Sequence, residues 1–343
     1  MKTVYSPDHR LHHARGELSD GRLEPPYEMP ERAEIVLRHV RDVGLGPVVE
    51  PGPCDRAVLE RVHAPDYVAH LEGAWADWVA EHGEETDALP LIWPVRTLRQ
   101  ACPRHIDGRV SYYAMDAGTP ITAGTWQAAT ASAAVAQAGA QLVRQEGGPV
   151  FSLCRPPGHH AARDLLGGYC FLNNAAIAAQ WYLDHGAQRV AILDIDYHHG
   201  NGTQAIFYER SDVLFLSIHA DPADEFPYFL GYADETGAGP GAGANANYPL
   251  PWGSGWSEWA AALERACVRI ADHGPDVLVV SLGVDTFEGD PISRFRLASD
   301  DFPRVGARLA RLGLPTQFVM EGGYAVAEIG VNAVGVLAGF EGA

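Results

Sequence analysis

Short apolar runs alternate with helical patterns from about residue 120 onward, and this alternation limits the possible folds more than any other feature. The runs are Val150–Leu153, Arg189–Leu193, Val213–Ser217, Val277–Ser281 and Thr316–Met320. The helical patterns cover Thr125–Glu146, Asn174–Asp184, Ser257–Asp272, Asp300–Leu312 and Val326–Ala338. Continuous apolar strands between helices are typical of βαβ units. The sequence therefore predicts an α/β protein with a central, mostly parallel β-sheet flanked by helices on both faces.

The first 120 residues are less regular. A proline opens a helical pattern over Pro30–Val43, which is a common start for a helix. Leu89–Pro120 carries four prolines and little periodicity. Connections of that length are usually functional or interfacial. We expect a single domain over residues 1–343, with an inserted long loop at about 84–120.

Several classes of protein are disfavoured by the composition. The first 22 residues are polar and lack the apolar core of a secretory signal, and the longest apolar stretch, Val277–Val284, is too short to cross a bilayer. A net charge of −19 repels nucleic acid and anionic membranes, and it suits a cationic substrate better than a phosphorylated one. We therefore predict a cytoplasmic protein that binds neither nucleic acid nor membrane.

The cysteines also favour a cytoplasmic protein. The five cysteines form no CxxC pair, so reduced thiols are expected rather than a disulfide framework. They are Cys54, Cys102, Cys154, Cys170 and Cys267.

Residues suited to catalysis follow every predicted strand. In strand order they are Arg155-Pro156-Pro157-Gly158-His159-His160, Asp194-Ile195-Asp196-Tyr197-His198-His199-Gly200, His219 with Asp221, Leu282-Gly283-Val284-Asp285, and Glu321-Gly322-Gly323-Tyr324. The carboxyl ends of parallel strands lie along one edge of the sheet, where α/β proteins place their sites. We therefore expect these residues to converge on one site.

A metal set is the first element of that site. Asp196 and His198 are two apart in a segment leaving a strand, so an extended backbone directs both to one side. Asp285 from another strand completes two carboxylates and one imidazole, and three protein ligands with an open position are typical of catalytic zinc. Such an oxygen-rich set also suits iron(II) or cobalt.

Proton transfer and oxyanion stabilisation need further groups. His159 and His160 lie on a Pro-Pro-Gly turn, and a neutral imidazole can accept a proton near pH 7 and later return it. Attack on an amide carbon places negative charge on its oxygen, which needs a hydrogen-bond donor. Tyr324, after two glycines, can supply that donor.

These motifs resemble those of the zinc-dependent histone deacetylase superfamily and, within it, the bacterial acetylpolyamine amidohydrolases. The segments that carry the resemblance are YSPDHRLHH, PRHIDGRVSYYAMDAGTPITAGT, RPPGHHA, GGYCFLNNAAIAA, DIDYHHGNGTQ, SLGVD and EGGY, which run essentially from end to end. The resemblance implies the arginase/deacetylase fold. It also implies a deacetylase that hydrolyses a linear amide bond of a small cationic acetylated amine.

The resemblance further implies specific roles. One zinc ion is expected on Asp196, His198 and Asp285, with His160 as general base and acid, His159 as an electrostatic partner held by Asp194, and Tyr324 polarising the carbonyl with zinc. A potassium ion is expected beneath the zinc, and its implied ligands are Asp194, Asp196, His198, Ser217 and Ile218. The implied substrate walls are Gly168, Tyr169 and Phe226, with Ile292 at the rim.

Two further points concern the relatives. Their long excursion packs on a second subunit and narrows the mouth of the active site, so a homodimer is expected. Glu17, Asp107 and Asp116 are the candidates to meet the distal ammonium of a polyamine. Asn201 stands where many histone deacetylases have an aspartate, and an amide can orient His160 without stabilising its cation.

Four other functions remain open at this stage. Cys154 precedes His159 by five residues and could form a thiolate–imidazole pair, although the end of an apolar strand favours a buried hydrophobe. The fold also hosts binuclear manganese ureohydrolases. A general acetyl-lysine deacetylase and a non-catalytic protein that binds acetylated ligands complete the alternatives. The sequence does not rank acetylputrescine, acetylcadaverine and acetylspermidine.

Overall fold

The computed structural model describes residues 1–19 and 21–343. Within them the chain forms an eight-stranded sheet in which every pair of neighbouring strands runs parallel. The strands are β1 (Lys2–Val4), β4 (Val48–Val49), β5 (Val150–Ser152), β6 (Val190–Asp194), β7 (Val213–Ala220), β8 (Asn245–Leu250), β9 (Val277–Leu282) and β10 (Thr316–Met320). Their order across the sheet is β4-β1-β5-β10-β9-β6-β7-β8. The predicted α/β architecture is confirmed.

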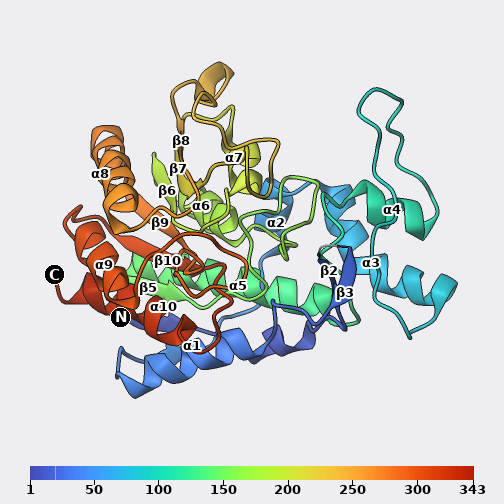
Figure 1. Ribbon diagram of the computed structural model, residues 1–343, viewed down its shortest axis with the longest axis horizontal. Helices are drawn as coiled ribbons and strands as arrows, with labels where there is room; N and C mark the ends of the chain where they lie inside the picture. The colour runs from blue at the N-terminus through green and yellow to red at the C-terminus, as the bar shows by residue number, and fades with distance from the viewer. Residues whose placement is uncertain (20) are drawn as a thin grey trace.

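Helices cover both faces of this sheet (Figure 1). One core contains apolar residues of α2 (Arg56–Val62), α3 (Pro65–His82), α4 (Ile106–Tyr112), α5 (Thr125–Glu146), α6 (Asn174–Asp184) and α7 (Asn201–Phe207). The other core contains those of α1 (Glu31–Asp42), α8 (Trp256–His273), α9 (Phe302–Ala310) and α10 (Ile329–Glu341). Short 3₁₀ helices lie at η1 (Pro7–Leu11), η2 (Gly239–Gly241) and η3 (Ser299–Asp301).

The two cores follow from the alternation of side chains along each strand. On β6, Val190 and Ile192 point into one core, whereas Ala191 and Leu193 point into the other. A strand buried on both faces must be apolar throughout, which is why these strands read as continuous hydrophobic runs.

The predicted elements agree with the structure to within a few residues, and two strands differ in an informative way. Strand β7 continues to Ala220, so His219, which was predicted to follow the strand, lies inside it and is buried. Strand β8 was not predicted, because NANYPL has no continuous apolar run. It pairs with β7 at an edge of the sheet, where less of a strand has to be apolar.

The segment predicted as a long inserted loop contains α4 and an extension that reaches out from the body of the molecule (Figure 1). We call residues 89–105 the arm. Its apolar side chains are exposed, with Leu91 at 76%, Ile92 at 66% and Leu98 at 68%. A separate hairpin of β2 (Glu17–Ser19) and β3 (Arg22–Glu24) is formed early in the sequence. Among the described residues, the helices are too short or too polar to cross a bilayer.

Candidate active site

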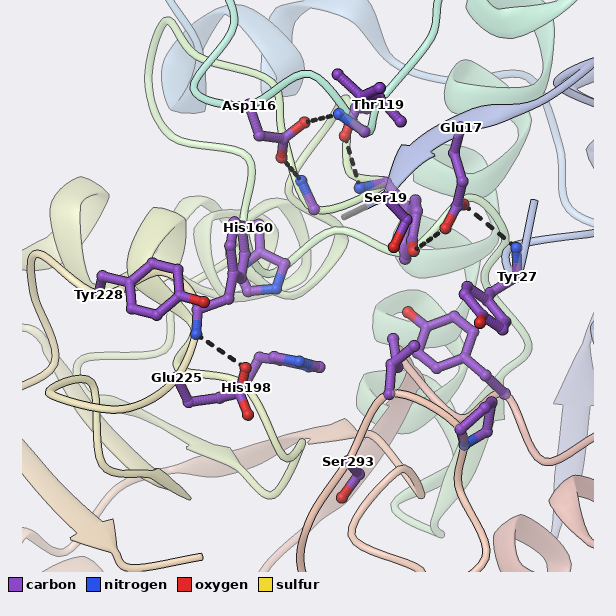
Figure 2. A pocket seen from close by; sticks show the side chains of 18 of the residues that line it. Glu17, Ser19, Tyr27, Asp116, Thr119, His160, His198, Glu225, Tyr228 and Ser293 are labelled. Carbon is purple, nitrogen blue, oxygen red and sulfur yellow. Dashed lines mark hydrogen bonds between the residues drawn. The ribbon is translucent and has the colours of Figure 1, made fainter. Parts of the chain in front are cut away.

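A cavity of about 590 Å³ opens at the carboxyl ends of the parallel strands. Figure 2 shows His160 and His198 facing its interior, with Glu17 and Asp116 along one margin and Ser293 along another. Its other walls include Tyr27, Gly168, Tyr169, Phe226, Trp252, Ile292 and Tyr324. Of the residues expected at this edge, His160, His198 and Tyr324 line the cavity, whereas His219 and Asp221 are not in the wall formed by the described residues.

The candidate metal set is formed by Asp196, His198 and Asp285, whose possible ligand atoms all lie within 4.8 Å of one another in buried positions. His198 Nδ1 lies 3.2 Å from Asp285 Oδ2 and 3.5 Å from Asp196 Oδ1. Burial and the neighbouring Asp196 carboxylate both raise the pKa of Asp285. Two buried carboxylates at this separation need a cation, and the donor set suits zinc.

Both carboxylates are held in place by the backbone. Asp196 Oδ2 accepts a hydrogen bond from Gly322 N at 2.8 Å, and Asp285 Oδ1 accepts one from Tyr197 N at 2.8 Å. The metal set is thus built from the ends of β6 and β9, and the segment after β10 braces it.

His159 and His160 are adjacent, but their Nδ1 atoms have different partners. His159 Nδ1 lies 2.9 Å from Asp194 Oδ2, and His160 Nδ1 lies 2.6 Å from Asn201 Oδ1. An amide oxygen can only accept, so His160 Nδ1 donates and its Nε2 keeps a free lone pair. Burial and the positive fields of His159 and His198 hold the pKa of His160 well below 6.5. His160 is therefore a neutral imidazole that can accept a proton.

His159 has the opposite protonation state. Burial alone would lower its pKa, but the nearby carboxylates of Asp196 and Asp194 raise it to about 10. The division of roles inferred from the motif, with a neutral His160 beside a charged His159, is consistent with this geometry.

Tyr324 lines the cavity and is held on two sides. Its backbone N–H donates to Asp290 Oδ2 at 2.7 Å, and the Arg32 guanidinium lies 4.6 Å from the centre of its ring. Burial raises the pKa of the Tyr324 phenol well above 10, so the hydroxyl remains a donor. Neither Asp290 nor Arg32 was predicted, because each lies far from Tyr324 in the sequence and belongs to no motif.

The candidate substrate wall is formed by Gly168, Tyr169 and Phe226. Gly168 has a φ of +54°, and a Cβ there would lie 2.1 Å from His160 Cδ2, so only glycine fits. Tyr169 N donates to Thr119 Oγ1 at 2.9 Å. Phe226 meets the His160 ring edge to face, with centroids 5.1 Å apart.

The three candidate acids are not equivalent in position. Glu17 is 3% exposed and accepts hydrogen bonds from the Tyr169 hydroxyl at 3.0 Å and Tyr27 N at 3.2 Å. Asp116 lines the same cavity and accepts from Gly168 N. Asp107 is instead on α4, pairs with His82, and is absent from the cavity wall formed by the described residues.

The residues proposed for a monovalent cation are two members of the metal set, Asp196 and His198, and three residues of the adjacent strands β6 and β7. Asp194 and Ser217 are register partners on β6 and β7, and Ile218 follows in β7. Asp194 Oδ2 meets His159 and its Oδ1 accepts from Asp196 N at 3.1 Å. Ser281, the partner of Asp194 on β9, has a buried hydroxyl with no hydrogen-bond partner among the described residues.

Cys154 is poorly placed to be a nucleophile. Its thiol donates to Ser132 O in α5 at 3.4 Å, and burial, followed by the field of Glu321, raises its pKa. A raised pKa suppresses the reactive thiolate. The structure thus supports the interpretation of Cys154 as a buried hydrophobe.

The fold and this site define a deacetylase of the arginase/deacetylase class. The family model of the histone deacetylase domain matches residues 26–340. The chain belongs to that family.

Three relatives show how close the similarity is. The chain is 60% identical over 342 residues to acetylpolyamine amidohydrolase 2 of Pseudomonas aeruginosa, covering 100% of this chain and 99% of the relative. It is 51% identical to acetylpolyamine amidohydrolase of Mycoplana ramosa over the whole of both chains. The crystal structure of acetylpolyamine aminohydrolase from Burkholderia pseudomallei matches with a TM-score of 0.95, at 40% identity and with 99% and 98% of the two chains covered.

Proposed function

We propose that this chain is a zinc-dependent amidohydrolase that removes the acetyl group from acetylated diamines and polyamines, giving acetate and the free amine. The observation that carries the proposal is one cavity whose wall contains a neutral His160, the Tyr324 side chain, carboxylates at its margin and His198, which belongs to the buried Asp–His–Asp set. The similarity to three acetylpolyamine amidohydrolases supports the choice of substrate.

Asp196, His198 and Asp285 would hold the zinc ion. When bound there, zinc supplies Lewis acidity toward the attacking water and the substrate carbonyl. His160 Nε2 accepts the proton of that water and later delivers it to the leaving amine. The His159 cation, fixed by Asp194, stabilises negative charge beside the reacting carbon. The Tyr324 hydroxyl donates to the oxyanion.

The substrate is inferred from the walls of the cavity. Tyr169 and Phe226 would flank the methylene chain of the amine. Glu17 and Asp116 would attract its distal ammonium, and an ionised Glu17 would do so more strongly than a neutral one. Ile292 would contact the chain near the rim. Asp107 is not in the cavity wall formed by the described residues, and we propose that it meets the substrate only within a dimer.

Potassium is the proposed ion behind the zinc, with Asp194, Asp196, His198, Ser217 and Ile218 as candidate ligands. The buried Ser281 hydroxyl has no hydrogen-bond partner among the described residues, which supports a bound ion in this region. Its position beside Asp194 makes Ser281 an additional candidate.

A homodimer is also proposed, with the arm as part of the interface. No acidic residue occurs between Ala88 and Ile106, whereas Arg96, Arg99 and Arg104 are basic, in a chain of net charge −19. An exposed, apolar and basic segment of this kind suits the acidic surface of a second copy.

Acetate release tests the proposed function. Metal-stripped protein would be given acetylputrescine, acetylspermidine or an acetyl-lysine peptide, with and without zinc. Zinc-restored cleavage of the small amines, well above the peptide, is expected. Preference for the peptide would make the chain a general acetyl-lysine deacetylase, and two manganese ions per active protein would indicate the ureohydrolase chemistry. Absence of release from every substrate would leave a binding protein for acetylated ligands.

A further inference from the structure

A buried cluster of charge lies directly behind the catalytic segments. Glu28 precedes α1, Arg32 lies in the first turn of α1, and Arg155 follows β5. Their exposed fractions are 2%, 3% and 1%. Charged side chains at such depth are costly unless they are paired, so a specific role for this cluster is expected.

Glu28 joins the two arginines. Its Oε1 accepts from Arg32 Nη1 at 3.0 Å and from Arg155 Nε at 2.7 Å, and its Oε2 accepts from Arg155 Nη2 at 3.0 Å. The Arg155 pair is therefore bidentate, which fixes the plane of the guanidinium. One carboxylate orients both cations.

Arg32 connects Glu28 to the segment that contains Tyr324, the proposed oxyanion donor. Its Nη2 donates to Glu321 O at 2.7 Å and its Nε donates to Gly323 O at 2.6 Å. The same guanidinium lies 4.6 Å from the centre of the Tyr324 ring. Two carbonyls and one aromatic face of the segment after β10 thus depend on a single side chain.

Arg155 connects Glu28 to the amino-terminal segment. Its Nη1 donates to His9 O at 2.6 Å and His12 O at 2.9 Å, which ties the amino-terminal segment to the start of the turn that bears His159 and His160. Glu321 Oε2 accepts from Gly158 N at 2.6 Å, so the turn and the segment of Tyr324 are also joined directly.

The cluster keeps an excess positive charge. His9 and His12 stay neutral because burial lowers the pKa of each to about 4. Two guanidiniums and one carboxylate therefore leave one net positive charge, and Arg32 presents it to the face of Tyr324. A cation in this position favours a phenol that donates to an oxyanion.

We propose that Glu28 is a positioning residue for the deacetylation, acting through Arg32 to hold the Tyr324 hydroxyl at the oxyanion. This inference rests on the proposed function, because Tyr324 is the oxyanion donor there. Within the described residues, no hydrogen bond of Glu28, Arg32 or Arg155 goes directly to a member of the metal set. Arg32 does hold the carbonyls on either side of Gly322, whose N–H donates to Asp196, so zinc content is measured separately from kcat.

The test is Glu28→Gln in the full-length zinc enzyme, with acetylputrescine as substrate. The amide keeps the size of the side chain but faces Arg155 Nη2 with a second donor and removes the shared negative charge. We expect kcat to fall about tenfold, because only the transition state uses the placed hydroxyl, while KM and zinc content change less than twofold. Glu31→Gln, in the same first turn of α1, is the control: Glu31 is exposed, so this change should leave kcat unchanged.

A double-mutant cycle separates positioning from general damage. In a Tyr324→Phe background, Glu28→Gln should lower kcat by less than twofold further, because the hydroxyl it positions is absent. An equal fall in both backgrounds would overturn the proposal, as would a kcat of Glu28→Gln within twofold of the wild type. If Glu28→Gln does not fold, Arg32→Lys is measured in the same cycle, and failure of both to fold would overturn the proposal in favour of a purely structural role.

A structural readout keeps this test separate from that of the proposed function. In a crystal structure of the folded variant, the Tyr324 ring should leave its place under the Arg32 guanidinium, and an unmoved ring would contradict the inference. A wild-type protein that cleaves no acetylated amine would instead defeat the proposed function, while the position of the ring would still decide the role of Glu28.

Discussion

At the scale of single residues, the charge states of two adjacent histidines are set by their surroundings. Asp194 gives His159 a carboxylate partner, and Asn201 gives His160 an amide. The carboxylates of Asp196 and Asp194 raise the pKa of His159, whereas burial and the positive fields of His159 and His198 lower the pKa of His160 despite its hydrogen bond to Asn201. Two identical side chains at neighbouring positions are thereby suited to different tasks.

Tyr324→Phe tests the oxyanion donor. We expect kcat to fall on the order of 10²- to 10³-fold, because one donor to the developing charge is lost, with little change in substrate binding. Rates under single-turnover conditions and the Kd of acetylputrescine give the two quantities. Tyr228→Phe removes a hydroxyl from the same cavity and should leave kcat within twofold. Unchanged turnover in Tyr324→Phe would reject the mechanism.

Glu17 supplies a prediction about pH. Burial raises the pKa of its carboxyl to about 7, against 4.5 for a free glutamate. The folded state then binds the proton more tightly than the unfolded state, so its contribution to stability is full below pH 4.5 and is lost as the pH rises to 7. Glu17→Gln should therefore be more stable than the wild type at pH 8, on the order of 2 kcal/mol, and about equal to it at pH 4.5.

Urea unfolding of both proteins at the two pH values measures this difference. Glu24→Gln is the matched control, because Glu24 is the exposed register partner of Glu17 in the hairpin. A Glu17→Gln protein whose stability relative to the wild type is the same at both pH values would show that burial does not disfavour the Glu17 charge.

At the scale of elements, the segment after β10 approaches the metal set so closely that a glycine is required. A Cβ on Gly322 would lie 2.6 Å from both Asp196 Oδ2 and Asp285 Oδ2. These contacts are shorter than real Cβ contacts, so one carboxylate would have to move. The close approach also places the Gly322 N–H where it donates a hydrogen bond to Asp196.

Gly322→Ala should therefore weaken zinc binding by tenfold or more while the sheet still forms. Zinc affinity is measured by competition with a chelator, and folding by the thermal transition of the metal-free protein. Gly335→Ala in α10 is the control, since its Cβ would meet Pro303 at an ordinary 3.4 Å. Wild-type zinc affinity in Gly322→Ala would show that this contact is not limiting.

The elements that the sequence predicted share a physical cause. Strand β10 and helices α5 and α6 have the predicted bounds, because continuous burial forces an uninterrupted apolar pattern in the strand and Gly147 stops α5. Helix α1 was predicted from its proline and apolar pattern, whereas edge strand β8 and helices α2, α3 and α4 were not, since partial exposure leaves their patterns mixed. Candidate site residues that end strands were predicted from their motifs, whereas Glu28, Arg32 and Asp290 meet the candidate site only through tertiary packing.

At the scale of the whole molecule, charge is unevenly distributed. The arm is basic and apolar, and the remainder of the chain carries the acidic excess. Attraction between opposite surfaces of two copies strengthens at low ionic strength and is screened by salt. The proposed dimer should therefore dissociate more readily as salt increases.

Replacing Arg96 and Arg99 by glutamate should convert the proposed dimer to a monomer at micromolar concentration and raise KM for acetylputrescine. Light scattering after size-exclusion chromatography reports the mass. Arg38 and Arg41 on α1 have the same spacing and are also exposed, so their replacement by glutamate is the control. A wild-type protein that is already monomeric, or an arm variant that stays dimeric, would place the interface elsewhere.

The two buried carboxylates of the metal set have a consequence for the lifetime of the protein in a cell. Asp196 and Asp285 repel each other, and a cation bound between them stabilises the native state by mass action. A newly made chain that has not acquired its metal is therefore easier to unfold and is more often presented to proteases. The quantity of this protein, and not only its turnover rate, should follow the supply of zinc.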